Sequence, residues 1–166
     1  MAVAGIGVAW CTNLFNFMDG TDGYAAQESL FILLFVALLS PHFLSLVVVL
    51  SAAIIIFLTV NYPKAKIFMG DSGSYFLGYI LPGIMLYIAT HHPHFLISLL
   101  IISLLFTADA TFTLIKRIIK KESFFTAHRS HWYQRLYNIG YTHSFIFWLG
   151  VFINSVLLMF SLLSVF

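Results

Sequence analysis

The chain has 166 residues, of which 61% are apolar and only 8% are charged, and its formal net charge at pH 7 is +2. Soluble domains are about one-quarter charged, so this composition excludes an ordinary soluble protein, and the near-neutral charge gives no sign of a nucleic-acid partner. The single cysteine, Cys11, excludes an internal disulfide. Several apolar runs approach the roughly 20 residues that cross a bilayer. The sequence therefore predicts an all-α, polytopic transmembrane helix bundle.

The apolar segments follow one another with only short interruptions. Residues 1–12 cover only about half of a ~30 Å hydrocarbon core, so we expect a partial first helix. About five full spans are predicted after it, and Pro41 marks a tight hairpin between the first two because proline interrupts a helix. These spans are 24–40, 43–60, 75–90, 95–115 and 142–166. No repeat or linker separates them, so residues 1–166 are interpreted as one integral membrane domain.

The polar residues alternate with the spans in a way that predicts orientation. Threading the spans through a bilayer places the three longest polar segments on one side, and the short turns on the other. All eight Lys and Arg residues fall on the first side: Lys64, Lys66, Lys116, Arg117, Lys120, Lys121, Arg129 and Arg135. By the positive-inside rule that side is cytoplasmic. We therefore expect a multi-pass membrane protein whose polar clusters face the cytoplasm.

The first polar segment, 13–23, reads NLFNFMDGTDG. Asp19 and Asp22 are each followed by glycine, and Asp-Gly pairs favour turns. Such a loop can present both carboxylates to a cation or a polar substrate. The alternative is a plain connecting turn with solvated acids.

A second acidic loop surrounds Asp71, which lies between Gly70 and the sequence Ser72-Gly73-Ser74. Carboxylate oxygens suit Mg²⁺ or Mn²⁺, and Mg²⁺ usually takes one or two carboxylates together with substrate phosphates. Asp71 is therefore a candidate metal ligand. The alternative is an N-cap for the span that follows, a role that Asp or Ser fills well.

The third polar segment carries His128, Arg129 and His131, side chains suited to gripping a phosphate or diphosphate. Zinc is a weaker alternative, because structural zinc sites need four ligands and no cysteine lies nearby. Asp109 lies near the end of a predicted span. Acids in such positions are costly and usually face the bundle interior.

Three motifs together resemble the polyprenyl-phosphate N-acetylhexosamine-1-phosphate transferase family. They are NLFNFMDGTDG at 13–23, KIFMGDSGSYFLG at 66–78 and HRSHWYQRL at 128–136. The last of these is more similar to the branch that initiates O-antigen synthesis than to the peptidoglycan branch, which carries a triple histidine there.

The resemblance implies a reaction and roles for individual residues. The membrane would be the bacterial inner membrane, and its cytoplasmic face would carry the active site. A cytoplasmic UDP-N-acetylamino sugar would give its sugar 1-phosphate to undecaprenyl phosphate, with Mg²⁺ required and UMP released. Asp71 would bind the metal, and Asp19 would be an essential acid near the diphosphate. Asn16 and Asp22 would lie along the nucleotide. The catalytic set also includes His128 and His131, which with the substrate-binding Arg129 would hold phosphate or sugar.

The resemblance covers only the C-terminal half of a family member. Family members have about ten spans and an earlier aspartate-rich motif that nothing in this chain matches. We therefore expect the chain to be the C-terminal portion of a longer member, as the short first helix also suggests. Two other hypotheses stay open, a fragment that needs an N-terminal half and a small membrane transporter. The sequence leaves the choice of sugar and homo-oligomer formation undecided.

Overall fold

The structure is a computed structural model that describes residues 2–62, 64–121 and 131–165, with side chains from residue 5 onward. Every regular element in these ranges is helical, so the predicted all-α class is confirmed. The helices are α1 (Ala2–Met18), α2 (Tyr24–Leu39), α3 (Leu44–Asn61), α4 (Gly70–His91), α5 (Leu96–Ile102), α6 (Leu104–Ile119), α7 (Trp132–Asn138) and α8 (His143–Leu163). Short 3₁₀ turns lie at Pro41–Phe43, the predicted hairpin corner, and at Pro93–Phe95.

Three described segments are long and apolar enough to cross a membrane: Pro41–Asn61, Gly70–His91 and His143–Leu163. The expected span at 95–115 is instead two helices, α5 and α6, that meet at a bend of 70°. The bend lies at Ser103, whose hydroxyl donates to the Leu100 carbonyl at 3.1 Å. Thr107 in turn donates to the Ser103 carbonyl at 2.8 Å. Hydroxyls bonded back to the preceding turn often bend helices. If α5 and α6 are counted together as one broken span, the number of candidate spans among the described residues is four. α2, with 16 residues, is apolar but shorter.

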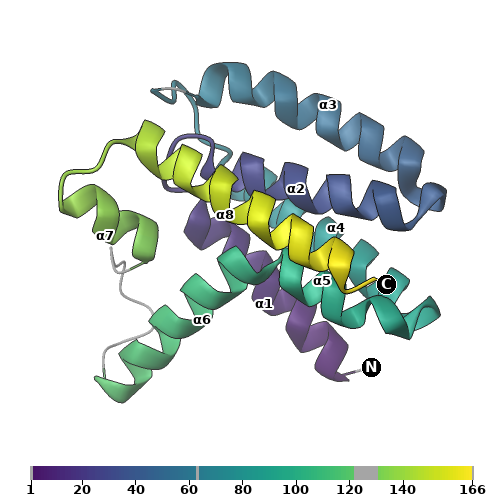
Figure 1. Cartoon of the computed structure of the whole chain (residues 1–166). Helices are drawn as coiled ribbons and strands as arrows, with labels where there is room; N and C mark the ends of the chain where they lie inside the picture. The colour runs from purple at the N-terminus through teal and green to yellow at the C-terminus, as the bar shows by residue number, and fades with distance from the viewer. Residues whose placement is uncertain (1, 63, 122–130, 166) are drawn as a thin grey trace.

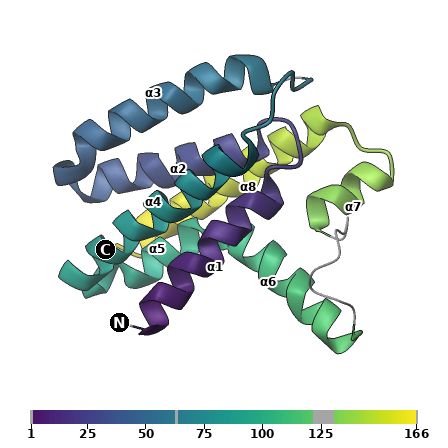
Figure 2. The same cartoon turned by 180° about the vertical axis from the view of Figure 1, so that it is seen from behind.

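The helices pack in a layered bundle (Figures 1 and 2). α1 lies along α4, α2 lies between α3 and α8, and α5 packs against α8, whereas α6 diverges from the bundle toward α7. α1 and α4 approach closely at Gly78, where an added Cβ would lie 2.7 Å from the Thr12 Cα. The Thr12 hydroxyl also donates to the Gly78 carbonyl at 3.2 Å. Glycine at this position therefore fixes α4 against the helix that leads into the first acidic loop.

α2 and α8 are joined by polar side chains within the core. Asn154 donates to a Glu28 carboxylate oxygen at 2.6 Å, and both side chains are completely buried. At Gly150 an added Cβ would overlap the Gln27 amide, so the two helices meet closely there. A buried amide–carboxylate bond of this kind fixes how two apolar helices are oriented.

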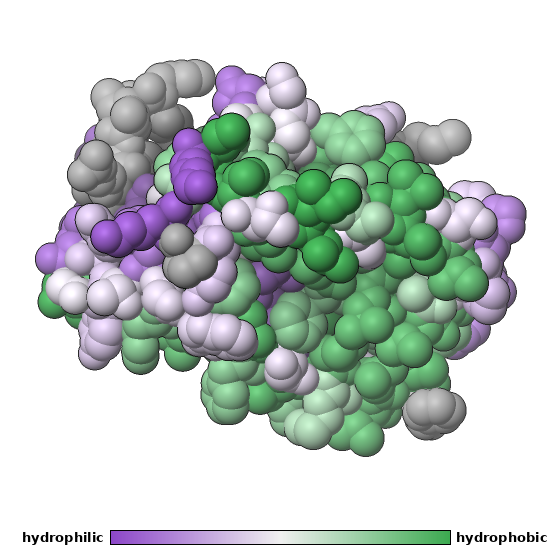
Figure 3. Space-filling model, turned by 90° about the horizontal axis from the view of Figure 1, so that it is seen from above, coloured by the Kyte–Doolittle hydropathy of each residue, from purple (hydrophilic) through white to green (hydrophobic). Residues whose placement is uncertain are grey.

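The surface has an apolar body and a polar end. On α3 large side chains such as Val49 and Ile56 are 66% and 69% exposed, which a water-facing helix would not tolerate. Figure 3 shows this apolar surface over the middle of the molecule, with polar residues gathered at the end where α7 lies in Figure 1. The described chain is thus a membrane-embedded helical protein with one enlarged polar end.

Candidate active site

The Asp19 loop and the Asp71 loop are joined directly at the polar end. Asp19 follows the last residue of α1, and its Oδ2 accepts the Gly70 backbone N–H at 2.9 Å. Gly70 has a φ of +64°, a left-handed conformation that glycine adopts without strain. Burial raises the pKa of the Asp19 carboxyl to about 6, although the Gly70 and Met69 backbone N–H groups lower it in part. Asp19 is therefore a half-buried acid held beside the start of α4.

A second bond, through Asn16, joins the end of α1 to the start of α4, because α1 continues to Met18 rather than giving way to the expected loop at residue 13. Asn16 Nδ2 donates to Asp71 Oδ1 at 2.8 Å and lies 3.1 Å from the Ser74 hydroxyl. Asp71 is exposed in the first turn of α4. The N-cap of α4 is Met69, with no side-chain cap bond, so the capping alternative for Asp71 or Ser is wrong. Asp71 is accessible, and one of its two oxygens is fixed by an amide.

Asp22 is only 5% exposed and joins the first loop to two other segments. Its Oδ2 accepts the Ala65 backbone N–H at 2.9 Å, and its Oδ1 lies 3.6 Å from His143 Nδ1. His143 Nδ1 also lies 2.7 Å from the Thr21 hydroxyl. The predicted contact of Asp22 with substrate stays a prediction. Sequence reasoning missed His143, which is marked only by being a lone imidazole at the start of the last span.

The turn at Gly23 is held by Asn61. Gly23 has a φ of +69°, and its N–H donates to Asn61 Oδ1 at 2.8 Å. Asn61 Nδ2 donates to the Ile67 carbonyl, also at 2.8 Å. One buried amide at the end of α3 therefore positions both acidic loops.

The third motif reaches the same place through α7. His131 is 3% exposed and immediately precedes α7, and its backbone N–H donates to Gln134 Oε1 at 3.2 Å. Its ring stacks on Phe17, two residues before Asp19, with centroids 5.9 Å apart. The structure therefore brings His131 to the Asp19 loop. His128 and Arg129 lie outside the described residues.

Tyr133 makes the main bond between α7 and the first loop. Its hydroxyl donates to the Phe17 carbonyl at 2.9 Å and accepts from Gln134 Nε2 at 3.1 Å. An added Cβ on Gly20 would overlap this hydroxyl. Burial, together with the charges of Asp109 and Asp19, raises the pKa of Tyr133 well above its usual value. Tyr133 is part of the third motif, but nothing local in the sequence indicates that it contacts Phe17.

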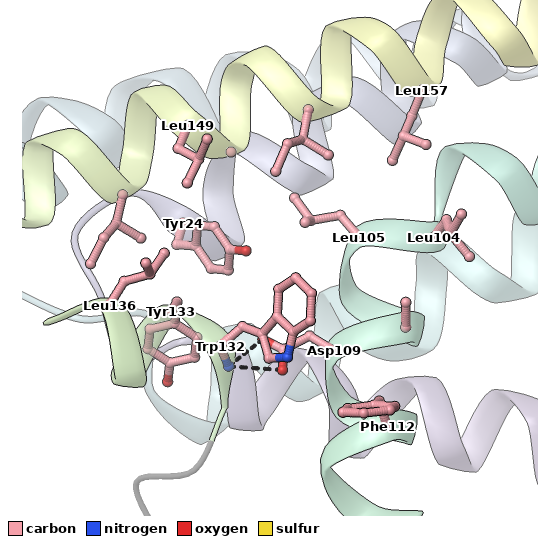
Figure 4. Close-up of a pocket in the computed structure, with 14 residues that line it drawn as sticks. Tyr24, Leu104, Leu105, Asp109, Phe112, Trp132, Tyr133, Leu136, Leu149 and Leu157 are labelled. Atoms are coloured by element: carbon pink, nitrogen blue, oxygen red, sulfur yellow. Dashed lines mark hydrogen bonds between the residues drawn. The ribbon is translucent and has the colours of Figure 1, made fainter. Parts of the chain in front are cut away.

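Asp109 is buried, as expected for an acid near the end of a span. Its Oδ1 lies 3.6 Å from His131 Nδ1. Both of its oxygens accept the backbone N–H of Trp132, at 2.9 and 3.1 Å, and the Thr113 hydroxyl donates to Oδ1 at 3.2 Å. Figure 4 shows the two Trp132–Asp109 bonds at the edge of a cavity between α6, α7 and α8.

The structure contains apolar and polar hollows, and the cavity in Figure 4 and the polar pocket border residues of the site. The cavity in Figure 4 has a volume of about 350 Å³ and is lined mostly by leucine, isoleucine and aromatic side chains. A second apolar cavity of about 380 Å³ lies between α1, α4, α5 and α6. A polar pocket of about 270 Å³ lies beside Gly20, Thr21, Gln134 and Asn138. The polar end can thus receive a charged substrate next to space for an apolar chain.

The donor set at this end suits a hard cation that is shared with a substrate. The described residues contain no cluster of three or more His, Cys, Asp or Glu side chains around a common point. Asp71 supplies an accessible carboxylate, and Mg²⁺ bound through one or two carboxylates takes its other ligands from phosphates and water. The residues therefore fit Mg²⁺ in a substrate complex better than a closed protein-only site.

The fold and the site define a helical membrane protein in which three separate segments build one composite polar site. Residues 1–89, more than half of the chain, match Glycosyl transferase family 4. The chain therefore belongs to this family, as the resemblance of its motifs to polyprenyl-phosphate N-acetylhexosamine-1-phosphate transferases predicted.

Curated relatives agree with this assignment. The chain is 37% identical to a probable undecaprenyl-phosphate N-acetylglucosaminyl 1-phosphate transferase of Bacillus subtilis, over 80% of the chain and 39% of the relative. It is 29% identical to a decaprenyl-phosphate N-acetylglucosaminephosphotransferase of Mycobacterium leprae, over 84% of the chain and 43% of the relative. A phospho-N-acetylmuramoyl-pentapeptide-transferase of Thermosynechococcus vestitus is 43% identical over 59% of the chain and 25% of the relative. The chain thus matches less than half the length of each of these relatives.

Proposed function

We propose that the chain carries the catalytic loops of an enzyme that transfers an N-acetylamino-sugar 1-phosphate from a UDP-sugar to undecaprenyl phosphate. A phosphate oxygen of the lipid would attack the β-phosphorus of the UDP-sugar and form a new P–O–P bond. The bond from that phosphorus to the bridging oxygen would break, and UMP would leave. The observation that carries this proposal is the pair of bonds from Asp19 to Gly70 and from Asn16 to Asp71, which unites two acidic motifs.

Each residue has a role that its chemistry supports. Asp71 would hold Mg²⁺, which when bound neutralises charge on the diphosphate. Asp19 would act as the essential acid beside that diphosphate. Asn16 and Asp22 would contact the nucleotide, and His131 would bind phosphate or sugar together with His128 and Arg129. Fixed donors and charges placed where charge accumulates supply the main part of such catalysis.

The proposed setting is the cytoplasmic face of the inner membrane. In the threading of the predicted spans, the basic residues fall on the same side as the acidic loops, in keeping with the positive-inside rule. The apolar cavity beside Asp109 and Tyr133 suits the hydrocarbon chain of a lipid carrier whose phosphate reaches the polar site. The HRSH form of the third motif supports a role at the first membrane step of O-antigen or other cell-envelope polysaccharide synthesis.

The test is transfer of radiolabel from UDP-N-acetylglucosamine, and from related UDP-sugars, to undecaprenyl phosphate by the chain in detergent. Labelled lipid should form with Mg²⁺ or Mn²⁺ and disappear with EDTA. Asp71→Asn and Asp19→Asn should each abolish it. Ser98→Ala is the matched control, because it removes a buried hydroxyl bonded to Ser164 at 2.8 Å, apart from the site. Full activity in either Asp variant would refute the assigned role.

The second candidate is a catalytic half that works only with an N-terminal portion, and the short coverage of the relatives favours it. Here the chain alone would give no labelled lipid, and co-expression with the first half of a relative would restore transfer. Transport is the least supported alternative, since Asp19, Asp22 and Asp71 gather at one end, whereas a relay needs groups along a path. A transporter would move solute without a nucleotide sugar.

A further inference from the structure

We propose that Asp109 is a positioning residue, whose carboxylate fixes the first residue of α7 and so holds His131 against the Asp19 loop. The proposal rests on the proposed function, since this position serves catalysis only if His131 contacts substrate. Asp109 lies in α6, outside the three motifs, and nothing local in the sequence indicates this task.

The bond itself is strong and specific. Asp109 Oδ1 and Oδ2 lie 2.9 and 3.1 Å from the Trp132 nitrogen, so one backbone N–H is shared by both oxygens. The carboxylate is 6% exposed, and a charged acceptor in a buried place makes a stronger bond than a neutral one. The dashed lines in Figure 4 show this bond joining α6 to the start of α7.

α7 has a second anchor on a different helix. Tyr133, the next residue, donates to the Phe17 carbonyl at the end of α1 at 2.9 Å. Consecutive residues of α7 are therefore attached to α6 and to α1, and these two attachments fix both its place and its rotation. His131 immediately precedes them, with its ring on Phe17 and its Nδ1 3.6 Å from Asp109 Oδ1.

Removal of the Asp109 carboxylate would leave α7 held by the Tyr133 bond and by ring contacts such as that of Tyr137 with His143. α7 would stay near the site, but His131 would lose its fixed position. The proposed nucleotide contacts, Asn16 and Asp22, are not on α7, so the KM for UDP-sugar should change by less than about threefold. The kcat should fall by about 100-fold, because a misplacement near 1 Å costs that much.

The test combines hydrogen–deuterium exchange with kinetics in the chain, supplied with an N-terminal half if transfer needs it. In Asp109→Ala the amides of α7 should exchange at least about tenfold faster, while those of α8 stay unchanged. Asp109→Asn keeps one acceptor oxygen, so it should restore part of both the protection and the kcat. Ser98→Ala, a buried polar deletion elsewhere in the bundle, should leave both as in the wild type.

Unchanged exchange of α7 in Asp109→Ala and Asp109→Asn would overturn the positioning role. Faster exchange with an unchanged kcat would also overturn it. Equal proportional losses of α7 protection and of kcat in Asp109→Ala and in the Ser98→Ala control would overturn it as well. Absence of transfer by the wild-type protein would instead contradict the proposed function. The exchange measurement would still decide whether Asp109 holds α7.

Discussion

The contact between Gly20 and Tyr133 gives a prediction that can be worked out from the geometry. Tyr133→Phe removes a hydroxyl that donates one bond and accepts another, so we expect it to lower the free energy of unfolding by about 1–2 kcal/mol. Gly20→Ala in the wild type would force a methyl group into that hydroxyl, and such overpacking costs about 1–3 kcal/mol.

The effects of the two substitutions on the free energy of unfolding should not be additive. Without the hydroxyl, the next atom that the new methyl meets is the ring carbon Cζ, at 3.3 Å, which is tight but tolerable. Gly20→Ala should then cost less than 1 kcal/mol, or even stabilise by restricting the unfolded chain, which is worth about 0.4–1 kcal/mol. The expected coupling energy is about 1–2 kcal/mol, well within the range seen for residues in contact.

The assay is a double-mutant cycle measured by titrating the folded protein with SDS in mixed micelles, with helical circular dichroism as the signal. A control cycle pairs Gly20→Ala with Ser98→Ala, which lies in α5 and should show no coupling. Equal destabilisation by Gly20→Ala in the wild-type and Tyr133→Phe backgrounds would refute the claim that α7 docks on the Asp19 loop through this hydroxyl.

Three further outcomes are expected. Burial raises the Asp19 pKa from 3.8 to about 6, so this carboxyl stabilises the fold below pH 4 and loses that contribution as the pH rises through 6. The thermal midpoint of the wild type minus that of Asp19→Asn should therefore fall between pH 4 and pH 6.5, and a constant difference would contradict this. Asn16→Ala removes the amide that orients the Asp71 carboxylate, so half-maximal transfer should need several-fold more Mg²⁺. An unchanged Mg²⁺ titration would count against the metal role of Asp71. Asn61→Leu leaves the Gly23 N–H and the Ile67 carbonyl without their partner and should cost about 2–3 kcal/mol in the same SDS titration, whereas Asn61→Asp, which retains the acceptor, should cost less.

Much of the architecture follows from local properties of the chain. Apolar runs and turn residues predicted the helical class and the hairpin at Pro41, because the bilayer requires internally bonded helices of a set length. The alternation of spans also predicted that Asp19, Asp71 and His131 would meet at one end, and the structure brings these three segments together. The bend at Ser103 was not predicted, because it depends on whether the Ser103 and Thr107 hydroxyls bond to carbonyls of the preceding turn.

Where each polar side chain lies at that end, and which groups it contacts, was decided only by the tertiary structure. Asp22 resembles Asp19 in sequence, yet it is buried against Ala65 and His143, whereas Asp71 is exposed rather than capping α4. The attachment of Tyr133 to Phe17 joins residues 116 positions apart, and no local pattern encodes it. Hydropathy is a property of each segment and can be read along the chain. Hydrogen bonds between segments depend on how the helices rotate and approach, which packing at sites such as Gly78 and Gly150 determines.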